Sequence, residues 1–297
     1  MTGYETLELR PLAGALGAEI GGVDLARPLE PRQFTEIRRA FLEHLVIFFR
    51  DQTLTPQQHE AFSARFGALS RMPYVKPLDD HPDIIAVLKE ADERKISVFG
   101  GAWHSDFSFL DEPPLGSVLY ALETPSYGGD TLWSNMYAAY DALSAGMKRL
   151  LDSIVALHSG SVYGVDGIPK DLRTSRSIAI SRNNPEADIE RGHPAIRVHP
   201  DTGRKALFVN PIYTTRFDGM TRAESAPILD FLYAHATRPE FTCRFRWQAR
   251  SLALWDNRCA MHYAINDYDG QRRLMHRTTI AGDRPVGPVA AVASQHH

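Results

Sequence analysis

The chain has 297 residues, of which 43% are hydrophobic and 23% are charged, a composition typical of water-soluble globular proteins. Its formal net charge of −3 gives it no general attraction to nucleic acid or to an anionic membrane surface. The first residues lack the basic and apolar regions of a secretory signal, and no apolar run approaches the length of a membrane span. We therefore expect a cytoplasmic protein without nucleic-acid or membrane partners, in which local cations hold any bound anion.

In the first fifty residues, the pattern predicts short strands, one helix and a core strand. Apolar and polar residues alternate over Leu7–Asp24 around several glycines, which indicates short strands joined by turns. Apolar residues at helical spacing predict a helix over Pro31–Leu45. The apolar, β-rich run Val46–Phe49 is typical of a buried strand.

The next segment carries signals for both ends of a helix. Thr55 followed by Pro56 is typical of an N-cap with proline at the first helical position. The helix would run to about Phe66 and end at Gly67, because glycine readily takes the left-handed conformation that closes many helices.

Strand patterns dominate the rest of the chain. Two helical intervals interrupt them, over Met136–Leu151 and Thr221–Ala236. Residues 160–192 form a polar stretch long enough for a lid, and residues 286–297 form a tail rich in small residues. The predicted strands are Ile84–Leu88, Gly116–Leu122, Thr131–Trp133, Ile154–His158, Ala195–His199, Ala206–Val209, Phe241–Trp247, Leu252–Trp255 and Arg272–Ile280.

No repeat, low-complexity block or linker divides the chain, so we expect a single domain over residues 1–297. Its strands would form a β-sandwich or barrel with helices packed outside it. The two cysteines, Cys243 and Cys259, lie in apolar strand-like segments and are expected to be reduced thiols.

The tripeptide His-Ser-Asp at 104–106 is the sharpest local signal. In an extended chain, residues i and i+2 point to the same face, so His104 and Asp106 can reach one ion. The tripeptide alone is weak support, but a later segment, residues 255–262, follows an apolar strand and adds His262. Two histidines and one carboxylate leave positions open for a cosubstrate and dioxygen, as in non-haem iron(II) oxygenases, although zinc accepts the same ligands.

A cationic pattern follows the last of these histidines. If residues 272–280 form a strand, Arg273, Met275, Arg277 and Thr279 share one face, and two guanidinium groups project together into the interior. Buried unpaired cations are costly, and the planar fork of arginine suits carboxylates or sulfonates. The alternative is two solvated arginines on an edge strand, which would be favoured if no metal site lay nearby.

Residues 128–130, Gly-Gly-Asp, predict a turn leading into the strand that begins at Thr131. The Thr131 hydroxyl could there join an arginine in binding a carboxylate. By itself the pattern indicates only a hairpin.

Together these segments resemble the taurine/2,4-dichlorophenoxyacetate dioxygenase family of iron(II)- and 2-oxoglutarate-dependent oxygenases, and most of all its aryloxyalkanoate-type members. The resemblance runs from Gly14 to Pro285. Its most specific parts are WHSD (103–106), YGGDTL (127–132), WDNR (255–258) with His262, and QRRLMHRTT (271–279).

The resemblance implies a mainly β fold with flanking helices, the distorted double-stranded β-helix or jelly roll. It implies an enzyme that uses Fe(II), with 2-oxoglutarate as cosubstrate and O2. His104, Asp106 and His262 would be the iron ligands.

The resemblance also implies two binding roles for the cationic strand. Thr131 and Arg273 would hold the distal carboxylate of 2-oxoglutarate. Arg277 would lie near the iron and meet the acidic group of the prime substrate.

Two positions depart from the members that oxidise taurine. Met72 and Gly100 stand where an amine-binding histidine and asparagine would be expected, which argues against taurine. Phe107, Met72 and Tyr213 would line an apolar pocket, and Tyr213 could add a hydrogen bond to the acid, although each also suits an ordinary core. We therefore expect hydroxylation of an aryloxyalkanoate-like or other apolar-bodied carboxylate. Succinate and CO2 would be formed, and the product would break down where the oxidised carbon bears a leaving heteroatom.

Three alternatives remain open. An alkyl sulfonate or sulfate-ester dioxygenase of the same family would use the same residues. A zinc hydrolase would give no role to Thr131, Arg273 and Arg277, and a non-catalytic jelly-roll binding protein is excluded only by turnover. The predicted partners are a small organic acid and further copies of the chain in a homo-oligomer.

Overall fold

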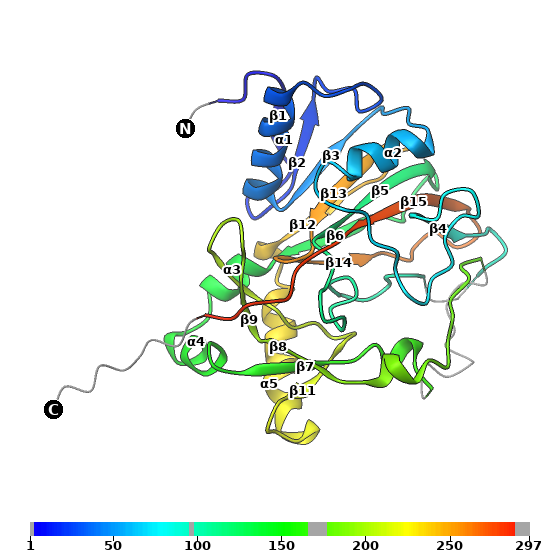
Figure 1. The fold of residues 1–297 in the computed structure, drawn as a ribbon. Coiled ribbons are helices and arrows are strands. Elements are labelled where there is room, and N and C mark those ends of the chain that lie inside the picture. Colours follow the sequence, from blue (N-terminus) through cyan, green and yellow to red (C-terminus); the bar gives the residue numbers. More distant parts are fainter. Residues whose placement is uncertain (1–2, 95–97, 166–176, 289–297) are drawn as a thin grey trace.

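The computed structural model describes residues 3–94, 98–165 and 177–288, and Figure 1 shows their arrangement. The helices are α1 (Pro31–His44), α2 (Pro56–Ser63), α3 (Met136–Asp141), α4 (Ala145–Leu151) and α5 (Arg222–Ala236). The strands are β1 (Glu8–Pro11), β2 (Ala18–Gly21), β3 (Val46–Phe49), β4 (Ile84–Lys89), β5 (Gly116–Glu123), β6 (Thr131–Asn135), β7 (Val155–His158), β8 (Arg191–Pro194), β9 (Ile196–Val198), β10 (Lys205–Leu207), β11 (Thr214–Phe217), β12 (Thr242–Phe245), β13 (Leu252–Asp256), β14 (Ala260–Ala264) and β15 (Arg273–Ile280).

The largest sheet has seven strands in the order β1-β2-β3-β13-β5-β15-β4. Its neighbours are antiparallel except for β2 and β3, which run parallel. Both faces are covered, so β3 and β13 read as continuous apolar runs rather than as alternating patterns. Within β13, Leu252 and Leu254 enter the core on one face, and Ala253 and Trp255 enter the core on the other.

Helices α1 and α2 cover the outer face of this sheet, as Figure 1 shows. The predicted cap of α2 is confirmed, because the Thr55 hydroxyl accepts from the amide of Gln58 and the Gln58 side chain accepts from the amide of Thr55. The helix ends at Ser63, however, so its predicted end at Gly67 is wrong. The chain leaves the helix early because residues 68–70 pair with the end of β15.

The inner face of the large sheet packs on a three-stranded sheet in the order β12-β6-β14. Aromatic rings fill the space between the two layers. The ring of Phe48 stacks on that of Phe245 at 4.0 Å and meets that of Trp133 edge-on at 5.3 Å. Trp133 also lies 5.9 Å from Trp255, so the two sheets share one sandwich core.

A second set of elements, with the sheets β11-β7-β8 and β10-β9, lies beside this sandwich together with α3, α4 and α5 (Figure 1). The single helix predicted over Met136–Leu151 is wrong, because it is two helices. Ser144 breaks it, since its hydroxyl accepts from the amide of Met147 and caps α4. The strands β8, β11 and β14 were not predicted, because each is short and their residues show no clean alternation.

The predicted lid is described except for residues 166–176, and the predicted tail is described as far as Pro288. On the far side of the gap, the chain pairs with residues 74–76, and the amide of Ser181 donates to the carbonyl of Tyr74 at 2.7 Å. In the tail, the carbonyl of Val286 accepts from the amide of Val198 at 2.8 Å. Among the described helices, none combines the length and the apolar character that crossing a bilayer requires.

Candidate metal centre and active site

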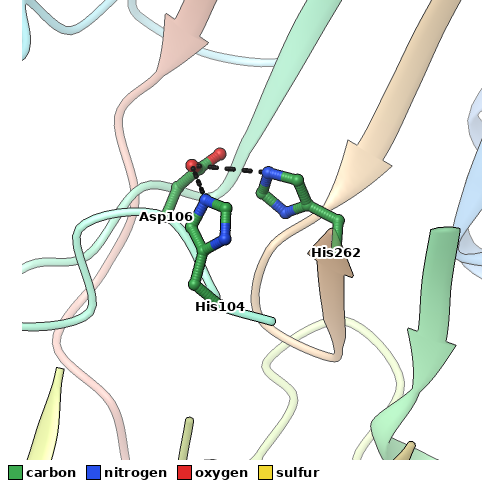
Figure 2. Close-up of side chains that lie close together, drawn as sticks. All are labelled: His104, Asp106 and His262. Carbon is green, nitrogen blue, oxygen red and sulfur yellow. Dashed lines mark ion pairs between the residues drawn. The ribbon is translucent and has the colours of Figure 1, made fainter. Parts of the chain in front are cut away.

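The side chains of His104, Asp106 and His262 point toward one another, as Figure 2 shows. Each histidine donates its backbone amide to the carbonyl of the other, at 3.0 and 2.8 Å, so a single antiparallel bridge sets the two side by side. Asp106 lies in a turn after this bridge, and not in the extended strand that the i, i+2 argument assumed. The convergence therefore depends on a long-range pairing and a turn.

The donor atoms of the three residues suit a divalent transition metal. Nε2 of His104 lies 3.5 Å and Nε2 of His262 lies 3.7 Å from the same oxygen, Oδ1 of Asp106 (Figure 2). Nδ1 of His104 contacts the carbonyl of Ala102 at 2.8 Å, which makes Nδ1 the protonated nitrogen and leaves the Nε2 lone pair for a metal. Burial and the neighbouring His104 hold the pKa of His262 well below its ordinary value, so its imidazole is neutral, as a ligand must be.

Asp106 is held from several sides. The Asn257 side chain accepts from its backbone amide at 2.7 Å and donates to its backbone carbonyl at 2.9 Å. Ser117 donates to Oδ2 at 3.0 Å, and Nη2 of Arg277 lies 2.9 Å from the same oxygen. Burial alone would raise the pKa of Asp106, but Arg277 and the two histidines outweigh burial and hold that pKa below its ordinary value. The carboxylate is therefore ionised.

The two arginines of β15 are buried on one face, as the alternation predicted. Strand β15 lies between β5 and β4, so the alternative of an edge strand is wrong. Nε and Nη2 of Arg273 have no hydrogen-bond partner among the described residues, and burial lowers the pKa of this guanidinium. Trp247 links it to Thr131, because the Arg273 guanidinium lies 5.9 Å from the Trp247 ring centre and the indole Nε1 donates to the Thr131 hydroxyl at 2.9 Å. A buried cation with unpaired donors suits an anionic ligand such as a carboxylate.

A cavity of about 210 Å³ opens beside His104 and Asp106. Most of its wall is apolar or backbone. It is lined by Val98, Phe99, Gly100, Gly101, Ala102, His104, Asp106, Phe107, Val162, Tyr163, Ile180, Arg182, Ile212 and Tyr213.

Two of the three predicted pocket residues line this cavity, and the third does not. Phe107 and Tyr213 line it, whereas Met72 lines a separate cavity of about 20 Å³ and packs in the same apolar cluster as they do. Gly100 also lines it, with φ +78°, and a Cβ there would lie 3.2 Å from Cε1 of His104. A residue with a side chain would be strained at this position.

The described part of residues 160–192, the predicted lid, supplies one side of the cavity wall, and sequence reasoning named none of the residues there. Tyr163 is buried, its ring lies parallel to that of Phe107 at 5.9 Å, and its hydroxyl lies 3.4 Å from that of Tyr213. Ile180 and Arg182 complete this side. No periodic pattern marks these residues, because Tyr163 ends a 3-10 helix of only three residues, Ser161–Tyr163, and Ile180 and Arg182 lie outside the regular helices and strands.

Sequence reasoning also missed a second buried cluster, His199, Asp256 and Cys259, whose donor atoms lie within 4.8 Å of one another. Asp256 is already bound by His199 at 2.9 Å and by two nitrogens of Arg258 at 2.9 and 2.7 Å. Burial and the charge of Asp256 raise the pKa of the Cys259 thiol well above its ordinary value. This cluster is an ion-pair network and does not suit a metal.

Comparison with known proteins identifies the family. The family described as taurine catabolism dioxygenase TauD, TfdA family, matches residues 8–279. An alpha-ketoglutarate-dependent sulfate ester dioxygenase from Pseudomonas putida is 36% identical over 282 residues, covering 95% of this chain and 91% of the relative. An (S)-phenoxypropionate/alpha-ketoglutarate-dioxygenase from Sphingobium herbicidovorans is 30% identical over 301 residues, covering 97% and 98%.

Solved structures agree with this assignment. The crystal structure of a taurine dioxygenase from Burkholderia xenovorans matches with a TM-score of 0.79 at 36% identity, covering 96% of this chain and 94% of that chain. The match confirms the predicted jelly roll. The cofactors implied are Fe(II), 2-oxoglutarate and O2, and the donor set described above fits the metal. The chain belongs to the TauD/TfdA family and is an iron(II)- and 2-oxoglutarate-dependent dioxygenase.

Proposed function

We propose that this dioxygenase oxidises a small organic anion with an apolar body, with His104, Asp106 and His262 as the iron ligands. One observation carries the proposal: three buried ligand side chains converge beside a mostly apolar cavity, with the Arg277 guanidinium against Asp106. When bound, iron and 2-oxoglutarate supply the oxidation of a C–H bond by dioxygen, with succinate and CO2 as coproducts. The chain as a whole, residues 1–297, would work as one oxygenase domain.

Arg273 and Thr131 would bind the distal carboxylate of 2-oxoglutarate. The unpaired nitrogens of buried Arg273 support this role, since they require an anion. The hydroxyl of Thr131 accepts from Trp247, so its proton is available to a carboxylate oxygen.

Arg277 would bind the acidic group of the prime substrate. Its guanidinium carbon lies 5.8 Å from the ring centre of Phe107, which lines the cavity, so an acid at Arg277 would place its body along this wall. Phe107 and Tyr213 would contact that body and exclude water from it. Met72 would support the wall from behind, through the apolar cluster that it shares with them.

For the substrate class, we propose an alkyl sulfate ester first. A relative named as a sulfate ester dioxygenase is 36% identical, against 30% for the one named as a phenoxypropionate dioxygenase. The aromatic wall of Phe107, Tyr163 and Tyr213 favours an aryloxyalkanoate as second candidate. Taurine is disfavoured, because the only carboxylate among the described lining residues is Asp106, which already pairs with Arg277 and so is not available to an ammonium group.

A substrate screen tests the proposal. The enzyme is given Fe(II), ascorbate, oxygen and 2-oxoglutarate, and succinate is measured with a medium-chain alkyl sulfate, an aryloxyalkanoate, a linear alkyl sulfonate or taurine. We expect the alkyl sulfate to give the highest kcat/KM and taurine the lowest. A higher kcat/KM for taurine than for every apolar-bodied acid would contradict the substrate class, and no succinate with any acid would contradict the function.

A further inference from the structure

The side chain of Asn210 holds a turn that forms one part of the cavity wall. It is 1% exposed, and its Oδ1 accepts from the backbone amides of Ile212 at 3.2 Å and Tyr213 at 3.0 Å. Ile212 and Tyr213 both line the cavity. Because Oδ1 is occupied by these amides, the orientation of the Asn210 side chain is fixed and its Nδ2 points away from the turn.

The other end of this side chain reaches the segment that carries a metal ligand. Nδ2 of Asn210 donates to the hydroxyl of Ser108 at 2.8 Å, and Ser108 is fully buried two residues after Asp106. The same hydroxyl lies 3.0 Å from Nδ1 of His158, so it is held in place from a second side. One amide group therefore joins the two walls that carry Asp106 and Tyr213.

The residue between Asp106 and Ser108 has an unusual backbone. Phe107 has φ +46°, a left-handed backbone conformation that residues other than glycine rarely adopt. It persists only where the surrounding contacts enforce it. On one side, the Asn257 side chain holds both backbone groups of Asp106. On the other side, Asn210 holds Ser108. The strained residue is thus fixed at both ends by an asparagine.

We propose that Asn210 is a positioning residue that sets the distance between Asp106 and the wall at Tyr213, and so aligns the substrate with the metal. The inference rests on the proposed function, in which Asp106 is an iron ligand and Tyr213 contacts the substrate. Without this link, 2-oxoglutarate is still consumed at the metal, but the substrate C–H bond lies out of position. The two electrons that the substrate C–H bond would have supplied then come from the ascorbate in the assay, and succinate forms without oxidised product.

The first test is the ratio of succinate to oxidised product in Asn210→Ala, measured with whichever acid gives the most succinate in wild type. We expect the ratio to rise at least about threefold, since small misplacements of a reacting group cost large factors in rate. The matched control is Asn135→Ala, because Asn135 is also buried and bonds to Ala138 and Ala15, which do not line the cavity. An unchanged ratio in Asn210→Ala, or an equal rise in both variants, would overturn the proposal.

The second test needs no turnover. Hydrogen exchange of the metal-free protein should show the amides of Ile212 and Tyr213 exchanging about tenfold faster in Asn210→Ala, because their acceptor is gone. The amide of His262, which donates to His104, should not change. In Ser108→Ala the two wall amides should keep their protection, because their acceptor, Oδ1 of Asn210, is still present. Unchanged exchange at both wall amides would reject the role of Asn210 even if wild type gave no succinate, an outcome that would reject the proposed function separately.

Discussion

Two buried clusters in this protein each combine histidine with aspartate, and only one of them suits a metal. In the first, His104, Asp106 and His262, the histidines turn Nε2 toward one carboxylate oxygen beside a cavity. In the second, His199 and Asp256 are paired with each other, and Arg258 completes the charge balance. Proximity of ligand types alone therefore does not mark a metal site.

The difference lies in which atoms already have partners. Nδ1 of His199 accepts from the amides of Asp201 and Thr202, and its Nε2 donates to Asp256, so neither nitrogen has a lone pair for a metal. Nε2 of His104 and Nε2 of His262 instead face one oxygen, Oδ1 of Asp106, at 3.5 and 3.7 Å, which is longer than an ordinary hydrogen bond. The first cluster therefore suits a metal because its nitrogen lone pairs converge on one point beside a cavity, whereas those of the second cluster are already used in hydrogen bonds.

The largest predicted effect is on metal binding, which a substitution in the first cluster should abolish and a substitution in the second cluster should not. Asp106→Ala should bind no stoichiometric Fe(II) or Mn(II) and should give only background succinate, because it removes the one anionic ligand. Cys259→Ser and wild type should each bind one metal. Metal titration with a spectroscopic readout measures both variants, and full metal binding by Asp106→Ala would contradict the assignment.

The second prediction concerns stability. Asp256→Ala should lower the free energy of unfolding by about 3–5 kcal/mol, because it leaves the buried Arg258 without its main partner. Urea denaturation measures the loss, and metal bound per folded molecule should stay at one. A variant that stays folded but loses its metal would show that the second cluster belongs to the metal centre.

The third prediction divides the roles of the two arginines. Arg273→Ala should raise the KM for 2-oxoglutarate roughly thirtyfold, equivalent to about 2 kcal/mol for lost hydrogen bonds to a charged group. Arg277→Ala should leave that KM nearly unchanged and weaken use of the prime substrate. Titration of each variant against both substrates checks this, and a change in only the 2-oxoglutarate KM of Arg277→Ala would refute the division.

The smallest predicted effect is a pH dependence from histidines outside both clusters. Burial lowers the pKa of His59 and of His158 to about 3, so the folded protein keeps both neutral where the unfolded chain protonates them. The contribution of these two histidines to the free energy of unfolding is therefore fully present above about pH 6.5. It is lost as the pH falls toward 3, by up to about 1.4 kcal/mol per pH unit for each histidine. Urea denaturation of the metal-free protein between pH 7 and about pH 5 measures this slope. His59→Gln should lower the slope, and an equal slope would show that His59 does not contribute.

The sequence predicted those parts of the molecule that depend on local spacing. Alternation placed Arg273 and Arg277 on one buried face of β15, and the capping signal at Thr55 located the start of α2. Both patterns depend on the periodicity of a single element, which the order of residues specifies directly. The motifs around residues 104 and 262 also pointed to three side chains that the fold brings together, although their role as iron ligands stays a prediction.

Tertiary structure alone decided which residues meet across the cavity. Tyr163 lines the cavity from the end of a short 3-10 helix, Arg182 lines it from irregular backbone, and Met72 packs in the apolar cluster behind it. None of the three residues carries a periodic signal in the sequence. The link from Asn210 to Ser108 spans 102 positions in the chain, and one buried amide makes it. Such contacts depend on how finished elements pack against one another, and a local pattern carries no information about that packing.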